Sequence, residues 1–421
     1  MLLSLILTAG CGGEDAPSPA PSPPPVAEPT PTPTPAAPPL SAVQRLKLAI
    51  GSGAPLQTDP AAVTVTSSAT TSIPGAAVIP ADDPRIRILG GRWVRLADPL
   101  QSFIMGQATG YASPGVPRDV PTSERHSVNF GYEFILPAGQ DSFEIVTIEA
   151  GSQEMMTIRI DGRATDALGY DLRLRSDGSE RFIRIALPPA QQARTIAIGT
   201  PARVFGGLRL PAGNTLGTLP DATNDASVVF EGDSISEGSV SSSWLRSWVG
   251  LAAIELGIRN PINIAQGGSG YIAHREGWRP IPQRIDDVLR AVADGPPDAV
   301  VVAAGINDCN SYPADDVGAV ALDYFRALRV GAPDMVIVVL GPFSGRSDPY
   351  PDALATCRDS IFASARQVSG TYVVDVAGWV TAENMDLVFG PVDNGPHPVN
   401  AGHALYASRG AAAIRTIIAG L

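Results

Sequence analysis

Charge, aromatic side chains, histidine and cysteine are all scarce in this chain of 421 residues. Charged residues make up 17% and aromatic residues 6%, and there are four histidines and three cysteines. The formal net charge is -12, with 42 acidic against 30 basic residues. Binding to a phosphate backbone requires a basic face, so we expect no nucleic-acid partner.

Several catalytic signatures are missing as well. The chain has no His-Glu-x-x-His segment and no paired-cysteine motif, so we expect neither a metal centre nor a cofactor. It has no Gly-x-Ser-x-Gly elbow, which argues against an α/β-hydrolase. Its glycine-rich block, residues 263–270, fits neither nucleotide-binding fingerprint, because no lysine follows it.

The first 40 residues cannot form a core. Residues 1–11 are an apolar, uncharged segment too short to span a bilayer, and the run of small residues before Cys11 resembles a bacterial lipoprotein signal. Thr8 stands where leucine is usual and no basic residue precedes the run, so a truncated secretory signal is the alternative. We expect an exported protein, lipid-anchored to a bacterial membrane through Cys11 (periplasmic or at the cell surface) or secreted.

Residues 12–40 form a proline-rich linker. Positions 17–39 hold 12 prolines in 23 residues. Such a segment favours polyproline II, and at about 3.1 Å per residue it would reach roughly 70 Å. It is either a stalk between an anchor and a folded domain or a disordered leader without a tethering role.

Apolar residues make up 44% of the chain, enough for a globular core, and the length allows two domains. Residues 41–220 alternate with period two, as in 156–160 and 182–187, and glycine or proline interrupts them about every ten residues. Asp161-Gly162 predicts a hairpin turn. We expect a β-sandwich domain, similar to a jelly roll.

After Ala226 the pattern changes to apolar runs that alternate with helical periodicity. Continuously apolar strands between helices indicate a parallel sheet buried on both faces. Residues 226–421 therefore predict a three-layer α/β/α domain of flavodoxin-like order. The apolar runs are 228–230, 261–264, 299–304, 335–340 and 372–376, and the helical patterns are 244–256, 283–293, 317–329, 353–367 and 401–418.

Four short segments in this second domain carry polar residues in a fixed order. They are Gly232-Asp233-Ser234, the block 263–270, Gly305-Ile306-Asn307-Asp308 and His397-Pro398. Ser234 follows an apolar strand, which places its hydroxyl at the carboxyl edge of the sheet, where ligand crevices form.

The set of four segments resembles the SGNH hydrolase superfamily, also called the GDSL esterases and lipases, over about residues 226–421. A β-domain in front of it resembles carbohydrate esterases with an N-terminal jelly roll. Three roles are open for the β-domain: it binds glycan, it forms one side of the active-site cleft, or it is a packing domain that binds nothing.

The resemblance assigns Ser234 as nucleophile and His397 as its base. A serine hydroxyl needs a base within hydrogen-bond distance, and Pro398 disfavours helix at His397 and leaves it in a loop. The resemblance also implies an oxyanion hole made of the Ser234 and Gly268 backbone N–H groups and the Asn307 side-chain amide. The alternatives are a plain turn glycine at Gly268 and a turn-capping residue at Asn307.

The third member of the triad departs from the family pattern. Family members have an aspartate three residues before the histidine, but here that position is Asn394 and Asp393 lies one residue earlier. A one-residue bulge would bring Asp393 to the ring of His397. Otherwise Asn394 or a backbone carbonyl orients the ring, leaving a Ser–His dyad, which the superfamily is known to include.

Cys309 and Cys357 are the two cysteines that remain when Cys11 is excluded. In an exported protein they predict a disulfide that closes a loop of about 50 residues, and two separate buried thiols are the alternative. Spacing alone does not decide between them, because a bridge needs Cα atoms within about 7 Å.

Together these features predict a serine esterase that hydrolyses O-acyl, specifically O-acetyl, groups on a carbohydrate. One alternative is a lipase or lysophospholipase of the same superfamily, which requires a long apolar acyl groove. The other is a surface glycan-binding protein whose hydrolase half has lost activity, which the departure at Asn394 keeps open.

Overall fold

The computed structural model describes residues 40–91, 93–96, 103–106, 130–148, 155–172, 179–199, 204–275, 279–292 and 295–421. The chain divides into two units, Met1–Pro39 and Leu40–Leu421. The predicted signal at residues 1–11 with Cys11, and the linker 12–40 except for Leu40, lie outside the described residues. Within the described ranges, no helix combines the length and apolarity that crossing a bilayer requires.

A fully parallel five-stranded sheet forms the centre of residues 226–421. The strand order is β15-β14-β16-β17-β18, which is 2-1-3-4-5 when the strands are counted along the chain. This is the flavodoxin-like order that the apolar runs predict, with the topological switch between β14 and β16. The strands are β14 (Ser227–Gly232), β15 (Asn260–Asn263), β16 (Ala299–Ala303), β17 (Val336–Leu340) and β18 (Thr371–Val374).

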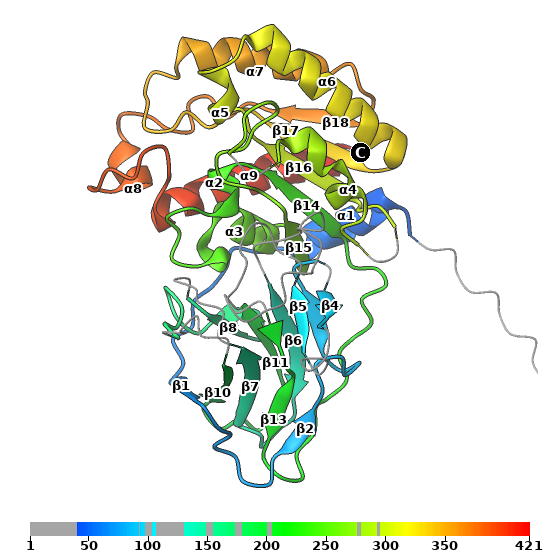
Figure 1. Ribbon diagram of the computed structural model, residues 1–421, viewed down its shortest axis with the longest axis vertical. Helices are drawn as coiled ribbons and strands as arrows, with labels where there is room; N and C mark the ends of the chain where they lie inside the picture. The colour runs from blue at the N-terminus through cyan, green and yellow to red at the C-terminus, as the bar shows by residue number, and fades with distance from the viewer. Residues whose placement is uncertain are drawn as a thin grey trace, which may run out of the picture. The chain divides into compact units, whose positions relative to one another are not determined.

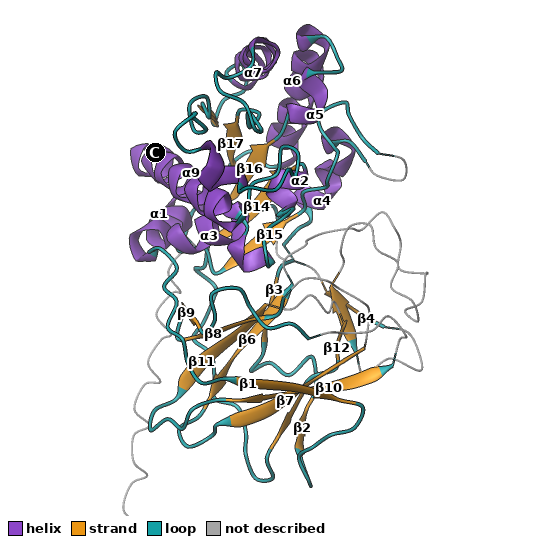
Figure 2. Cartoon of the chain, turned by 90° about the vertical axis from the view of Figure 1, so that its left-hand side faces the viewer, coloured by secondary structure: helices purple, strands orange, loops and turns teal. Residues whose placement is uncertain are grey.

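Helices cover both faces of this sheet, so the predicted three-layer architecture is confirmed (Figure 2). Successive strand side chains point to opposite faces, so Val228 and Phe230 pack into one core and Val229 into the other. The first layer holds α1 (Ala42–Ser52), α3 (Trp248–Glu255) and α9 (Asn400–Gly420), and the second holds α4 (Ile285–Leu289), α6 (Ala314–Gly331) and α7 (Asp352–Ala365). Shorter helices are α2 (Ser234–Glu237), α5 (Ile306–Cys309), α8 (Met385–Phe389), η1 (Trp244–Arg246) and η2 (Ile281–Arg284).

Helix α1 departs from the expectation that residues 41–220 form only a β-domain. It begins at a capping box between Ser41 and Gln44, and its buried residues Leu46 and Ala49 join the core that contains α9. Arg45 forms an ion pair with the buried Asp298. The helix therefore completes the apolar core on one face of the parallel sheet, although it lies in a distant part of the sequence. Two of its residues, Leu46 and Ala49, are buried.

After α1, the described residues up to Leu210 form the predicted β-sandwich, built from antiparallel sheets (Figure 1). Side chains from both five-stranded sheets share one core, where Phe134 meets Phe143 edge-to-face at 5.1 Å. Asp161 and Gly162 have φ of 50° and 81° and form the predicted hairpin turn between β8 and β9. The described sheets have the orders β1-β10-β7-β13-β2, β3-β6-β11-β8-β9 and β12-β5-β4. The strands are β1 (Thr64–Ser68), β2 (Ala77–Ile79), β3 (Arg87–Leu89), β4 (Trp93–Arg95), β5 (Ile104–Gly106), β6 (Gly131–Leu136), β7 (Ser142–Ile148), β8 (Thr157–Ile160), β9 (Arg163–Ala164), β10 (Glu180–Ala186), β11 (Arg194–Gly199), β12 (Val204–Phe205) and β13 (Leu208–Leu210).

Candidate active site

Ser234 lies at the point where β14 turns into α2. Asp233 caps this helix, because its carboxylate accepts the Ile235 N–H at 2.9 Å, and Gly238 ends it with φ of 101°. As the first residue of the helix, Ser234 has a backbone N–H without a partner in the helix. The residue is 8% exposed. The sheet edge therefore presents the hydroxyl and the backbone N–H of one residue together.

The imidazole of His397 contacts the Ser234 hydroxyl. Nε2 of His397 lies 2.8 Å from Ser234 Oγ, and Nδ1 lies 2.8 Å from the backbone carbonyl oxygen of Asn394. A carbonyl oxygen only accepts, so Nδ1 carries the proton and Nε2 is the acceptor for the hydroxyl of Ser234. A nucleophile, a base and a group that orients the base are thus arranged in a chain, as nucleophilic catalysis requires.

The structure corrects the predicted placement of Asp393. Its Oδ1 accepts the backbone N–H of Gly395 at 2.9 Å, while the Nδ1 position of His397 is taken by the Asn394 carbonyl. The bulge that would carry the Asp393 carboxylate to the ring is therefore absent from this described loop. The site has the geometry of a Ser–His dyad oriented by a peptide carbonyl, one of the arrangements that the sequence leaves open.

The glycine-rich loop and Asn307 meet beside Ser234. Gly268 has φ of 76°, a left-handed conformation that favours glycine. At the neighbouring Gly267, a β-carbon would lie 3.4 Å from Cβ of Ser234, so the loop runs against the serine. Nδ2 of Asn307 donates to the backbone oxygen of Ser269 at 2.8 Å. The structure therefore gathers Ser234, Gly268 and Asn307, which come from three separate segments, at the carboxyl edge of the sheet.

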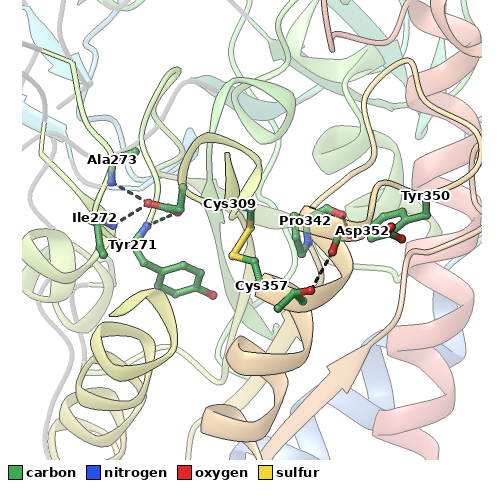
Figure 3. The surroundings of a disulfide bond; sticks show 10 residues. Tyr271, Ile272, Ala273, Cys309, Pro342, Tyr350, Asp352 and Cys357 are labelled. Atoms are coloured by element: carbon green, nitrogen blue, oxygen red, sulfur yellow. Dashed lines mark hydrogen bonds between the residues drawn. A yellow bond between two sulfur atoms is a disulfide. The ribbon is translucent and has the colours of Figure 1, made fainter. Parts of the chain in front are cut away.

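Asp308 supports this site, and our sequence analysis assigned it no role. Its buried carboxylate accepts the backbone N–H groups of Tyr271, Ile272 and Ala273 at 2.8, 2.9 and 2.7 Å (Figure 3). Burial raises the pKa of Asp308, and the three hydrogen bonds act in the opposite direction. A β-carbon at Gly270 would lie 2.0 Å from this carboxylate, so the loop also needs glycine there. The only sequence signal for this role is its position directly after Asn307.

A disulfide joins Cys309, at the end of α5, to Cys357 in α7 (Figure 3). The two Cα atoms lie 5.5 Å apart and the residues are separated by 48 positions. Of the two alternatives that the sequence leaves open, the bridge is the one present. It tethers the short helix that carries Asn307 to a long helix of the outer layer.

A buried ion pair lies beneath the glycine-rich loop. Arg284 is fully buried and donates to the carbonyl of Gly232 at 3.3 Å and to the hydroxyl of Ser269 at 3.2 Å. Its Nε lies 3.2 Å from Oε1 of Glu231, whose other oxygen accepts the hydroxyl of Tyr324. Burial raises the pKa of Glu231 to about 7, against the attraction of Arg284. The guanidinium thus links the strand that leads to Ser234 with the loop that carries Gly268.

A cavity of about 650 Å³ opens beside Asn307. Residues of α5 and α7, the loop between β17 and α7, and the loop that precedes His397 form its walls. Asn307, Arg346, Asp393, Gly395 and Pro396 are among the residues that line it. The cavity therefore borders both the predicted oxyanion donor and the loop that carries the base.

The remaining histidines have other surroundings. His403 is buried in α9, where Nδ1 accepts the Trp248 backbone N–H at 3.2 Å and Nε2 lies 3.1 Å from the Ser239 carbonyl oxygen. Burial lowers the pKa of His403 to about 4, so it is a neutral, packed residue at pH 7. His274 is exposed, and His126 lies outside the described residues. In the described part of the chain, no group of three or more His, Cys, Asp or Glu residues could hold a metal ion.

The chain is similar to known proteins in sequence and in fold. Residues 230–405 match the GDSL-like lipase/acylhydrolase family. A salicylyl-acyltransferase, SsfX3, from a tetracycline biosynthetic pathway is similar in structure, with a TM-score of 0.61 at 17% identity over 81% of this chain and 98% of that one. No match was found among curated proteins.

Two structures of a family two carbohydrate esterase from Clostridium thermocellum are also similar. The first, in complex with cellohexaose, has a TM-score of 0.53 at 16% identity over 70% of this chain and 94% of that one. The second, an active-site mutant, has a TM-score of 0.57 at 16% identity over 80% of this chain and all of that one. At these identities the structural likenesses show a shared fold.

Proposed function

We propose that the chain is a carboxylic ester hydrolase, because its residues 230–405 match the GDSL-like lipase/acylhydrolase family, and that it removes O-acyl, specifically O-acetyl, groups from carbohydrate. The observation that carries the proposal is the 2.8 Å contact between His397 Nε2 and Ser234 Oγ. This contact supplies a nucleophile with a base of the correct tautomer.

In the proposed reaction, Ser234 attacks the ester carbonyl while His397 Nε2 accepts the hydroxyl proton. His397 then donates that proton to the leaving alcohol, and the acyl group stays on Ser234. Water, deprotonated by the same nitrogen, attacks the acyl-enzyme and releases the acid. The carbonyl of Asn394 keeps the proton on Nδ1 throughout and orients the ring.

The negative charge that develops on the substrate oxygen needs preorganised donors. We assign this role to the backbone N–H groups of Ser234 and Gly268 and to the side-chain amide of Asn307. The amide has two N–H groups, and its bond to Ser269 uses one of them. That bond holds the amide in place, and the second N–H serves the oxyanion.

The cavity beside the site favours carbohydrate over lipid. Arg346 and Asp393 both line this cavity. An alcohol half rich in hydroxyl groups can hydrogen-bond to these two charges, whereas an apolar one would remove water from them without replacing it. The shared fold with the family two carbohydrate esterase, one structure of which holds cellohexaose, points the same way.

We also propose that the protein is exported, with Cys11 as its lipid attachment site. The bridge between Cys309 and Cys357 supports export, because disulfides persist in oxidising compartments. Labelling bacteria that express the chain with a palmitate analogue tests the anchor. The label should appear on the wild type and be absent from Cys11→Ser.

The substrate is tested with p-nitrophenyl acetate, p-nitrophenyl palmitate and acetylated xylan. The proposal predicts rapid acetate release from the first and third and little turnover of palmitate. Faster turnover of palmitate would instead identify a lipase. Retained binding to the polysaccharide without hydrolysis of any ester would identify a glycan-binding protein.

A further inference from the structure

The cavity beside Asn307 is lined by both charged and apolar residues. Its charged lining residues are Arg346 and Asp393, and Ile306, Pro351 and Leu354 supply apolar surface. A sugar ring has matching chemistry, because its hydroxyl groups lie around the rim and its C–H groups form apolar faces. A ligand with hydroxyl groups alone would leave the apolar lining residues exposed to water. A purely apolar ligand would remove water from the charges of Arg346 and Asp393 without replacing it.

Arg346 is anchored at the edge of this cavity. Its guanidinium donates to the carbonyls of Gly390 at 2.7 Å and Val392 at 3.4 Å and lies 5.8 Å from the ring centre of Phe389. A guanidinium has five N–H donors in a rigid fork, and these two bonds use two of them. The contacts therefore fix the side chain against the segment just before Asp393 and leave donors for a ligand.

Asp393 supplies the complementary acceptor. Its Oδ1 accepts the N–H of Gly395 at 2.9 Å, which fixes the carboxylate without using most of its acceptor capacity. The residue is exposed and lines the cavity. A fixed carboxylate and a fixed guanidinium that line the same cavity can bind hydroxyls of one ring, one as acceptor and the other as donor. Such charge-assisted hydrogen bonds are stronger than neutral ones.

The position of the cavity decides which half of the ester it holds. His397 must protonate the leaving oxygen, so the alcohol half of the substrate lies on the side of the His397 loop. Gly395 and Pro396, which immediately precede His397, line the cavity. We propose that this cavity is the subsite for the sugar alcohol, and that Asp393 and Arg346 determine specificity by binding the hydroxyls next to the acylated position. The inference rests on the proposed function and adds a role for Asp393 other than in catalysis.

The test compares two esters on the same enzyme preparations. One is a mono-O-acetylated methyl xyloside, and the other is cyclohexyl acetate, which has a six-membered ring and no hydroxyl. The ratio of their kcat/KM values is independent of the fraction of folded enzyme. Asp393→Asn and Arg346→Gln should each lower this ratio by roughly tenfold, the value of one hydrogen bond to a charged group.

Matched controls carry the same chemical changes elsewhere. Asp386→Asn changes an exposed aspartate of α8, and Arg366→Gln changes an exposed arginine that also lies over a phenylalanine ring, at 5.7 Å from that of Phe362. Both controls should keep the wild-type ratio.

A ratio that is unchanged in Asp393→Asn and Arg346→Gln would overturn the subsite. Equal losses on both esters in Asp393→Asn would also overturn it, because they would mean that Asp393 acts on His397. A wild-type enzyme that hydrolyses neither ester would overturn the proposed function itself, an outcome distinct from the other two.

Discussion

Nε2 of His397 lies 2.8 Å from Oγ of Ser234, although 163 positions separate the two residues. On the opposite side of the ring, a peptide carbonyl takes the place that a carboxylate has in a Ser-His-Asp triad. The carbonyl fixes the tautomer and the orientation of the ring through its dipole, without a full negative charge.

Asp393→Asn should lower kcat on p-nitrophenyl acetate by no more than about tenfold. Removing the aspartate of a true triad costs about 10⁴-fold, because the wrong tautomer then forms. Here the Asn394 carbonyl keeps the tautomer in either case. Steady-state rates of the variant and of the control Asp386→Asn provide the measurement. A loss near 10⁴-fold would restore Asp393 to the triad.

Asp308→Asn should lower kcat by about 10²-fold. The carboxylate accepts the backbone N–H groups of residues 271–273, which continue the loop directly after the glycine-rich block 263–270, and an amide would turn its NH₂ group toward at least one of them. The loop carries Gly268, and the loss of one oxyanion donor costs about 10²–10³-fold in comparable hydrolases. Asp323→Asn, on the exposed side of α6, is the matched control and should keep full activity. Equal activities of the two variants would contradict the supporting role of Asp308.

Replacing Cys309 and Cys357 together by serine should destabilise the protein and lower kcat. The bridge closes a separation of 48 residues, which corresponds to about 4 kcal/mol of loop-closure entropy. Urea unfolding measures this loss, and treatment of the wild type with reductant checks it without mutation. Because the bridge tethers the helix of Asn307, kcat should fall while KM changes little. An unchanged kcat in a destabilised variant would show that α5 holds its position without the tether.

Features encoded in one short segment of the chain were predictable from the sequence, whereas features that depend on tertiary contacts were not. The five strands and Ser234 were predictable, because each is a continuous apolar run or a short segment at the end of one. The partner of His397 Nδ1 was not, since the choice among Asp393, Asn394 and a carbonyl depends on one turn. In that turn Gly395, with φ of 65°, lets the Asn394 carbonyl reach the ring.

The buried arginine was beyond prediction for a different reason. Arg284 contacts the carbonyl of Gly232 and the hydroxyl of Ser269, which lie 52 and 15 positions away. Only the folded sheet brings these segments together, and nothing in the local sequence distinguishes Arg284 from a surface arginine. Helix α1 shows the same limit, because its partner α9 lies far along the chain.

His403 should make the protein sensitive to acid. Its folded-state pKa of about 4 lies below the usual 6.5, so its contribution to stability is present above pH 6.5 and is lost as the pH falls toward 4. The full contribution of this pKa shift to the free energy of unfolding is about 3 kcal/mol. The buried Asp233 acts in the opposite sense, because burial raises its pKa to about 7, and its contribution is therefore lost as the pH rises.

The comparison of wild type with His403→Gln isolates the histidine, since Asp233 is common to both. Urea unfolding at pH 7 and pH 4.5 should show that the variant loses less stability between these values than the wild type does. Identical losses in both proteins would mean that His403 does not titrate in this range.

The most direct test of the account is the turnover of p-nitrophenyl acetate by Ser234→Ala, with Ser239→Ala as the matched control. Removing the serine nucleophile should lower kcat by on the order of 10⁶-fold, to near the uncatalysed rate, while the variant unfolds at the same urea concentration as the wild type. Ser239→Ala, five positions further along the same turn, should retain activity. A folded Ser234→Ala protein that hydrolyses the ester at a rate near that of the wild type would contradict the assignment of Ser234 and His397 as the catalytic pair.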